Sequence, residues 1–138
     1  MAFTVEIVSA EQALWAGSAD FIVVPGSQGE LGIRTGHTPL LTYLKPGNVA
    51  VHEASGEVQH FYVSGGVVEV QPTGVIVLSD ASVRAQDLDE AEVLKAKAEA
   101  EELLKNKHDK LTYAEIELRL SQEISKLQSI EKYRSGRR

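Results

Sequence analysis

The chain has 138 residues, carries 14 Lys and Arg against 20 Asp and Glu, and contains no Cys. A formal net charge of −6 disfavours binding driven by nucleic-acid phosphates or an anionic membrane, since both need a positive excess. The absence of Cys excludes disulfides, thiolate nucleophiles and zinc–thiolate sites, and fits a reducing compartment. No signal-like start and no apolar run near the roughly 18 residues of a membrane span are present. We expect a soluble protein that is at most peripheral to a membrane.

Glycine and proline divide the chain into two regions. Ten of the 11 Gly and all 4 Pro precede residue 85. The region before this point also holds only three basic and eight acidic residues, so most charges lie in the shorter remainder. This shift in composition predicts one domain over 1–84 and a different element over 85–138.

Residues 1–84 alternate short apolar runs with turn signals, as all-β sandwiches and barrels do. Phe3–Ile7 alternates with a period of two, and other β-branched or aromatic runs end at turn residues such as Pro25-Gly26, Ser55-Gly56 and Pro72-Thr73-Gly74. A bend or bulge is expected at Gly65-Gly66. The further expected strands cover 21–24, 49–52, 58–63, 67–70 and 75–78. We predict eight or more strands in an antiparallel β-sandwich.

Residues 87–133 change to a helical period. Asp87 with Glu90 and Thr112 with Glu115 have the spacing of capping boxes, so a helix is expected to begin at each. An interruption at 106–109 separates them and predicts an antiparallel helical hairpin. The expected apolar positions are Leu88, Leu94, Leu103 and Leu104 in the first helix, and a continuous stripe of Tyr113, Ile116, Leu120, Ile124, Leu127 and Ile130 in the second. This core is thin, so we expect the hairpin to depend on docking to the sandwich or to a partner.

No residue set predicts catalysis or a metal site. The four His lack the spacing of a ligand pair. The Gly-rich stretch 26–36 lacks the phosphate-binding pattern and is interpreted as turns that need positive φ. Asp87 and Asp89 fit a helix start better than acid–base chemistry. We therefore expect no catalytic residue and no metal.

The C-terminal end is basic. It carries Lys126, Lys132, Arg134, Arg137 and Arg138 against Glu131. One interpretation is a solvated helix end whose cations suit the helix dipole. The other is an electrostatic contact with an acidic protein surface.

Several strings match one family together. They are Val8-Ser9-Ala10-Glu11, Gly29-Glu30-Leu31-Gly32-Ile33, Gly36-His37-Thr38-Pro39-Leu40-Leu41, Ser64-Gly65-Gly66-Val67-Val68-Glu69-Val70 and Leu88-Asp89-Glu90-Ala91. In this combination and order, over essentially the whole chain, the sequence resembles the epsilon-subunit family of bacterial F-type ATP synthases.

The resemblance implies a noncatalytic rotor subunit at the cytoplasmic face of the bacterial cell membrane, peripheral and attached through the complex. It implies that the sandwich binds the γ subunit and rests on the c-subunit ring, coupling rotation to ATP synthesis. Glu30 and His37 match positions that face the c ring; the alternative for His37 is a loop histidine bonded to backbone. The resemblance implies that the hairpin can fold against the sandwich or extend along γ toward the α and β subunits of the catalytic head, where it inhibits ATP hydrolysis with the basic tail as its contact.

The family's ATP-binding motif is only partly present. Leu88 and Asp89 match, but Glu92 and Val93 stand where the motif has Arg and Ala. A carboxylate repels phosphate, so we expect no cofactor and no specific ATP binding; Asp89 and Lys126 are the residues that would remain for it.

The sequence leaves two alternatives open. One is a freestanding β-sandwich binding module with a helical dimerisation hairpin. The other is a small metal-dependent sandwich hydrolase, which lacks recognisable ligands. The sequence also leaves open whether the hairpin is docked or extended, how strongly it inhibits, and which ion drives the motor.

Overall fold

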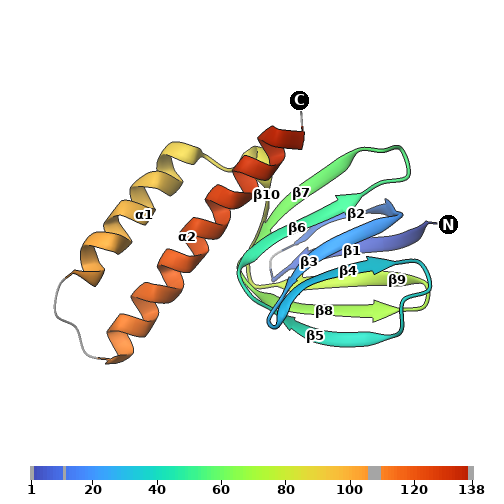
Figure 1. Cartoon of the computed structure of the whole chain (residues 1–138), viewed down its shortest axis with the longest axis horizontal. Helices are drawn as coiled ribbons and strands as arrows, with labels where there is room; N and C mark the ends of the chain where they lie inside the picture. The colour runs from blue at the N-terminus through green and yellow to red at the C-terminus, as the bar shows by residue number, and fades with distance from the viewer. Residues whose placement is uncertain (1, 11, 106–109, 137–138) are drawn as a thin grey trace.

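The computed structural model describes residues 2–10, 12–105 and 110–136. The strands among these residues are β1 (Phe3–Ser9), β2 (Ala13–Ala19), β3 (Phe21–Gly26), β4 (Gly29–Arg34), β5 (Leu40–Leu44), β6 (Gly47–His52), β7 (Val58–Val63), β8 (Gly66–Gln71), β9 (Gly74–Ser79) and β10 (Ser82–Arg84). A 3-10 turn, η1 (Ala85–Asp87), leads to helices α1 (Glu90–Leu104) and α2 (Lys110–Gly136). Figure 1 shows the two helices beside the β domain, with α2 between α1 and the strands.

The strands form a sheet that folds over on itself into two layers. The first layer runs β10-β7-β6-β3, with β4 beside β3, and the second runs β5-β8-β9-β1-β2. The pair Gly26 and Leu44 joins β3 to β5 and so links the layers. The predicted β-sandwich is confirmed. Its pairing is antiparallel except between β1 and β9, which run parallel.

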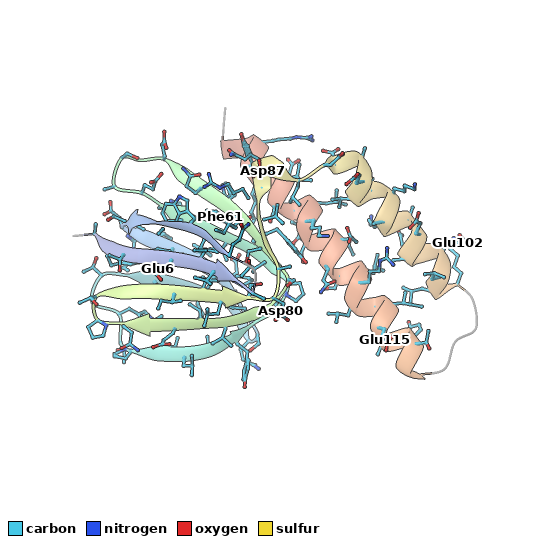
Figure 2. The ribbon with its side chains drawn as sticks, turned by 180° about the vertical axis from the view of Figure 1, so that it is seen from behind. Glu6, Phe61, Asp80, Asp87, Glu102 and Glu115 are labelled. Carbon is cyan, nitrogen blue, oxygen red and sulfur yellow. The ribbon has the colours of Figure 1, made fainter. Side chains whose placement is uncertain are left out.

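The sandwich core comes from alternate positions of the strands. Its buried residues are Phe3, Val5, Ile7, Ala19, Ile22, Val24, Ile33, Leu44, Val49, Val51, Phe61, Val63, Val68, Val70, Val75 and Val77. Phe61 is fully buried and is labelled among the strands in Figure 2. Because this cluster draws only on the strands, the sandwich buries its own core without help from the helices.

Most of the Gly-rich stretch 26–36 is a strand, so the interpretation of the whole stretch as turns was wrong. Gly29–Arg34 forms β4 and pairs antiparallel with β3. Gly29 and Gly36 do have positive φ, of 133° and 86°, as expected for turns. Gly32 instead lies within the strand, where a Cβ would stand 2.9 Å from the Phe21 ring. This glycine provides space for an aromatic ring, which sequence reasoning mistook for a turn signal.

The expected bend at Gly65-Gly66 is present. Both residues have positive φ, 114° and 134°. A Cβ on Gly66 would lie 2.0 Å from the carbonyl oxygen of Leu78. Only glycine fits there, because the conformation is disfavoured for other residues and the strands approach closely.

Both predicted helix starts were misplaced. The N-cap of α1 is Asp89, whose carboxylate accepts from the backbone N–H groups of Ala91 and Glu92 at 3.0 and 3.3 Å. Asp87 lies in η1, in the connection from β10 to α1 (Figure 2). Helix α2 already includes Lys110, so Thr112 is inside the helix rather than at its cap. The predicted interruption at 106–109 lies outside the described residues.

The expected continuous apolar stripe on α2 was also wrong. Of its members, Ile116 and Ile130 are buried, Leu120 and Leu127 are half-buried, and Tyr113 and Ile124 are 45% and 39% exposed. Glu123, Ser125 and Ser129 are buried instead. In α1, Leu94 and Leu103 are exposed, whereas Val93 and Ala100 are buried. Because α2 packs against α1 on one side and against β6, β7 and η1 on another, it has two narrow contact strips in place of one wide stripe.

Candidate functional site

The outer face of the first layer forms the floor on which α2 lies. Strand pairing places Ala50 of β6 opposite His60 of β7, and Asn48 opposite Tyr62. These residues alternate with core positions such as Val49, so their side chains point away from the sandwich interior. The floor is therefore largely polar, although most of it is covered.

Helix α2 meets this floor with small and polar side chains. The Ser125 hydroxyl donates to the carbonyl oxygen of Pro46 at 3.1 Å. Lys126 Nζ lies 5.4 Å from the centroid of the Tyr62 ring and 3.2 Å from Glu123 Oε1. Ser129 is fully buried, and its Oγ has no hydrogen-bond partner among the described residues. An interface with a buried orphan hydroxyl holds two elements less firmly than an apolar one of equal size.

Tyr62 and His60 are the titratable groups most altered by this interface. Burial, and then the Glu123 carboxylate, raise the pKa of Tyr62, so its hydroxyl remains protonated. The pKa of His60 is lowered, mainly by burial and further by Lys132 and His52. The Asn48 amide donates to His60 Nδ1 at 3.2 Å, which fits a neutral ring with its proton on Nε2.

The basic residues predicted at the C-terminal end pair within the molecule. The contacts of Lys126 are given above. Lys132 Nζ lies 3.6 Å from Glu30 Oε2 of β4. Arg134 Nη2 lies 2.5 Å from Glu90 Oε2 at the start of α1. Both pairs are substantially exposed to solvent, so each is worth at most about 1 kcal/mol. Arg137 and Arg138 lie outside the described residues.

The two predicted c-ring residues have local partners. Glu30 engages Lys132, as above. His37 follows β4, and its Nδ1 donates to the carbonyl oxygen of Thr38 at 2.6 Å. This is the geometry of the alternative interpretation, a histidine bonded to backbone. The two residues thus have different partners in the described structure, and their role at a c ring stays a prediction.

The structure does not bring the two candidate ATP residues together. The Asp89 carboxylate is occupied as the cap of α1, while Lys126 faces Glu123 and Tyr62 at the sandwich side of α2. Glu92 is exposed on the first turn of α1, so the anionic side chain stands in solvent where the family motif has a cation. Asp89 and Lys126 therefore do not form one binding site in this structure.

Sequence reasoning missed an apolar row on the outer face of the second layer, in which Tyr43 and Leu78 are exposed and Val67 and Val8 are half-buried. Tyr43 of β5 pairs with Val67 of β8, which pairs with Leu78 of β9, which in turn pairs with Val8 of β1. Tyr43 is 73% exposed and its strand neighbour Leu41 67%. The signal was available, since β8 and β9 have nearly continuous apolar runs, the pattern of strands covered on both faces. Such a row on a free surface indicates a contact surface for another protein.

Two further properties concern the described residues. Neither helix there combines the length and the apolarity needed to cross a bilayer. In the same residues, no three His, Asp or Glu side chains gather in the way that metal ligands do.

The comparisons with known proteins agree with one another. Residues 2–85 match the family described as "ATP synthase, Delta/Epsilon chain, beta-sandwich domain". A curated relative from Herminiimonas arsenicoxydans, the ATP synthase epsilon chain, is 46% identical over 134 residues, which are 96% of this chain and 96% of the relative. The fold also matches a chain of the Euglena gracilis mitochondrial ATP synthase, OSCP/F1/c-ring (TM-score 0.83, 19% identity, 94% of this chain and 81% of that one). A chain of the central stalk/c-ring of the Tetrahymena thermophila mitochondrial ATP synthase matches too (TM-score 0.61, 17% identity, 94% and 97%). The chain belongs to the ATP synthase epsilon chain family.

Proposed function

We propose that the protein is a noncatalytic rotor subunit of a proton-translocating F-type ATP synthase, in which residues 1–84 attach to the stalk and residues 85–138 regulate. The observation that carries this proposal is the contrast between the two outer faces of the sandwich. One face presents the exposed apolar row, and the other is covered by a polar, weakly held helix. A permanent partner suits the first face, and a reversible contact suits the second.

The apolar row is the proposed contact with the γ subunit. Tyr43, Val67, Leu78 and Val8 form one cross-strand line on a rigid sheet. Aromatic and aliphatic side chains that stand free on a folded surface supply the buried centre of protein interfaces. The row lies on the layer opposite to the one that holds α2, so the two contacts do not compete for the same surface.

The proposed c-ring contact uses Glu30 and His37, as the resemblance implies. Glu30 is the second residue of β4, and His37 lies three residues beyond the end of that strand. A polar, charged surface there suits a partner built of polar loops. The complex then holds the protein at the cytoplasmic face of the bacterial cell membrane.

The helical hairpin is the proposed regulatory element. Its printed polar contacts with the sandwich are one serine hydrogen bond, a cation over the ring of the buried Tyr62 and one exposed ion pair, and a buried hydroxyl lacks a partner among the described residues. These polar terms are small, so the main cost when the helices leave the sandwich is the exposure of covered side chains such as Tyr62. On leaving, Lys132 loses its carboxylate partner on the sandwich and becomes free for an acidic surface of the catalytic head. This release is the proposed route to inhibition of ATP hydrolysis.

Nucleotide binding is not included in the proposal. The Glu92 carboxylate would repel a phosphate, and the Asp89 carboxylate already accepts hydrogen bonds from the backbone N–H groups of the first turn of α1.

Truncation of the chain in the assembled ATP synthase tests the division of labour. A protein that ends after Asp87 keeps every residue of the sandwich core, so we expect it to assemble with γ and the c ring. ATP hydrolysis by the purified complex is expected to rise, because the inhibitory element is gone. Loss of assembly, unchanged hydrolysis, or a stable homodimer of the full chain that ignores γ would each contradict the proposal, and the last would favour the dimerisation module.

A further inference from the structure

We propose that His60 is a proton-binding site that controls the hairpin, and that a proton on its imidazole opposes the docking of α2. The inference rests on the step of the proposed function in which the helices leave the sandwich, and it adds a signal that drives this step. Three features of the structure support it: the hydrogen bond at Nδ1, the charges that surround the ring, and a cavity open to solvent beside it.

The hydrogen bond at Nδ1 makes a second proton on the ring costly. The Asn48 amide donates to His60 Nδ1 at 3.2 Å, so a proton on Nδ1 places two donors against each other unless the amide turns over and presents Oδ1, which has no hydrogen-bond partner among the described residues. Asn48 is only 6% exposed, and water does not readily replace this bond while α2 covers the floor. Protonation at Nδ1 therefore forces a buried amide beneath the helix to rearrange.

Charged or titratable groups face His60 from α2, β6, β10 and the turn before β7. Lys132 approaches from α2 and His52 from β6, Arg84 of β10 lines the same cavity, and Glu57 lines it from the turn before β7. Glu57 is exposed to solvent at the turn, and Glu30 is engaged by Lys132. Of these groups, Lys132 and His52 lower the pKa of His60, so a charged imidazole is repelled by Lys132 in particular.

A cavity gives solvent access to the ring in the docked state. It has a volume of about 540 Å³ and is lined by residues 55–60, Arg84, Gln86 and Tyr133. Tyr133 belongs to α2, so the helix forms one wall of the cavity. Protons consequently reach His60 without prior opening of the hairpin, and the ring then responds to the bulk pH.

The sign of the effect follows from linkage. In the docked state the pKa of His60 lies below its ordinary value of 6.5. When α2 leaves, burial and Lys132 are removed, so the pKa returns toward that value and the open state binds the proton more tightly. Docking is strongest above pH 6.5 and weakens as the pH falls through this value toward the lowered pKa. At pH 5.5, one unit below the ordinary pKa, one histidine changes the docking equilibrium by at most about tenfold.

The test uses the isolated full-length chain with two spin labels. The chain has no Cys, so Thr73→Cys on the sandwich and Ser135→Cys on α2, both exposed, provide unique sites. The fraction of long distances is expected to rise when the pH is lowered from 7.5 to 5.5, and His60→Gln, whose amide is neutral, should remove most of this rise. His37→Gln is the matched control, since His37 hydrogen-bonds within its own loop, and it should leave the rise unchanged.

Titration of the histidine ring signals by NMR provides a second measurement, which reports the pKa of His60 directly and does not depend on a change in the docking equilibrium. In the unmodified chain the pKa of His60 should lie below 6.5, and Lys132→Met should raise it. An identical pH response in His60→Gln, or a His60 pKa at or above 6.5, would overturn the inference. Because the distances are measured without the catalytic head, failure of the hairpin to inhibit ATP hydrolysis would refute the proposed function and leave this result standing.

Discussion

Two serines on the same face of α2 predict opposite effects of the same substitution. Ser125 and Ser129 are one helical turn apart and both are buried against the sandwich. Ser125 Oγ donates to Pro46, whereas Ser129 Oγ has no partner among the described residues. Ser125→Ala should therefore weaken docking of the hairpin, and Ser129→Ala should strengthen it.

The expected change in the docking equilibrium depends on whether each hydroxyl has a hydrogen-bond partner in the docked state. Ser125→Ala removes one net hydrogen bond, worth about 1 kcal/mol, and lowers the docking constant about fivefold. Ser129→Ala removes a buried hydroxyl that is solvated only when the helix is open, so docking gains about 1–2 kcal/mol, or about 5–30-fold. The higher helix propensity of Ala acts equally on docked and open helices and cancels from this difference.

The assay is the distance between labels at Thr73→Cys and Ser135→Cys at a fixed pH above 7. Mild urea brings both docked and open forms to measurable populations. Each serine variant is compared with the labelled parent, and circular dichroism checks that the helical content is preserved. If both substitutions shift the populations in the same direction, the view that polar satisfaction governs this interface is refuted.

Two further predictions concern single contacts. Asp89→Ala should lower the free energy of unfolding of the helical hairpin by about 1 kcal/mol, since it removes the N-cap. Asp87→Ala should change this free energy by less than about 0.5 kcal/mol. Urea unfolding followed by far-UV circular dichroism measures both, and equal effects would contradict the assignment of the N-cap to Asp89 alone. A double-mutant cycle of Lys132→Met and Glu30→Gln on the docking equilibrium should give a coupling below about 1 kcal/mol that disappears at high salt. A coupling well above that value, or one insensitive to salt, would mean that this exposed pair is a principal anchor.

The sequence was sufficient for the sandwich because its signals are local. Alternation in Phe3–Ile7 and the glycine turns at Gly56 and Gly65 each depend on a few neighbouring residues, and the structure retains them. The same reasoning failed at Gly32, since a glycine that provides room for Phe21 is indistinguishable from a turn glycine without knowledge of the partner strand.

The interface of α2 could not be predicted in the same way. A helical period identifies apolar positions but not the two separate surfaces against which a helix packs, so the predicted stripe included Ile124, which is exposed, and did not include Ser129, which is buried. The contact of Lys132 with Glu30 joins residues far apart in sequence, and the His60 environment depends on strand register as well as on the helix. Such sites require the tertiary arrangement, whereas capping at Asp89 rather than Asp87 was a local ambiguity between two nearby acids.

The short connection between β10 and α1 has a consequence for the strength of the docking contact. Only Ala85–Asp89 separates the last strand from the hairpin, a reach of about 17 Å when extended. The helices therefore remain near their docking surface after they open, at an effective concentration in the millimolar range. Under that condition a contact too weak to hold two separate proteins still keeps a tethered hairpin closed for much of the time. Rebinding also becomes a first-order process that does not depend on the amount of protein in the cell.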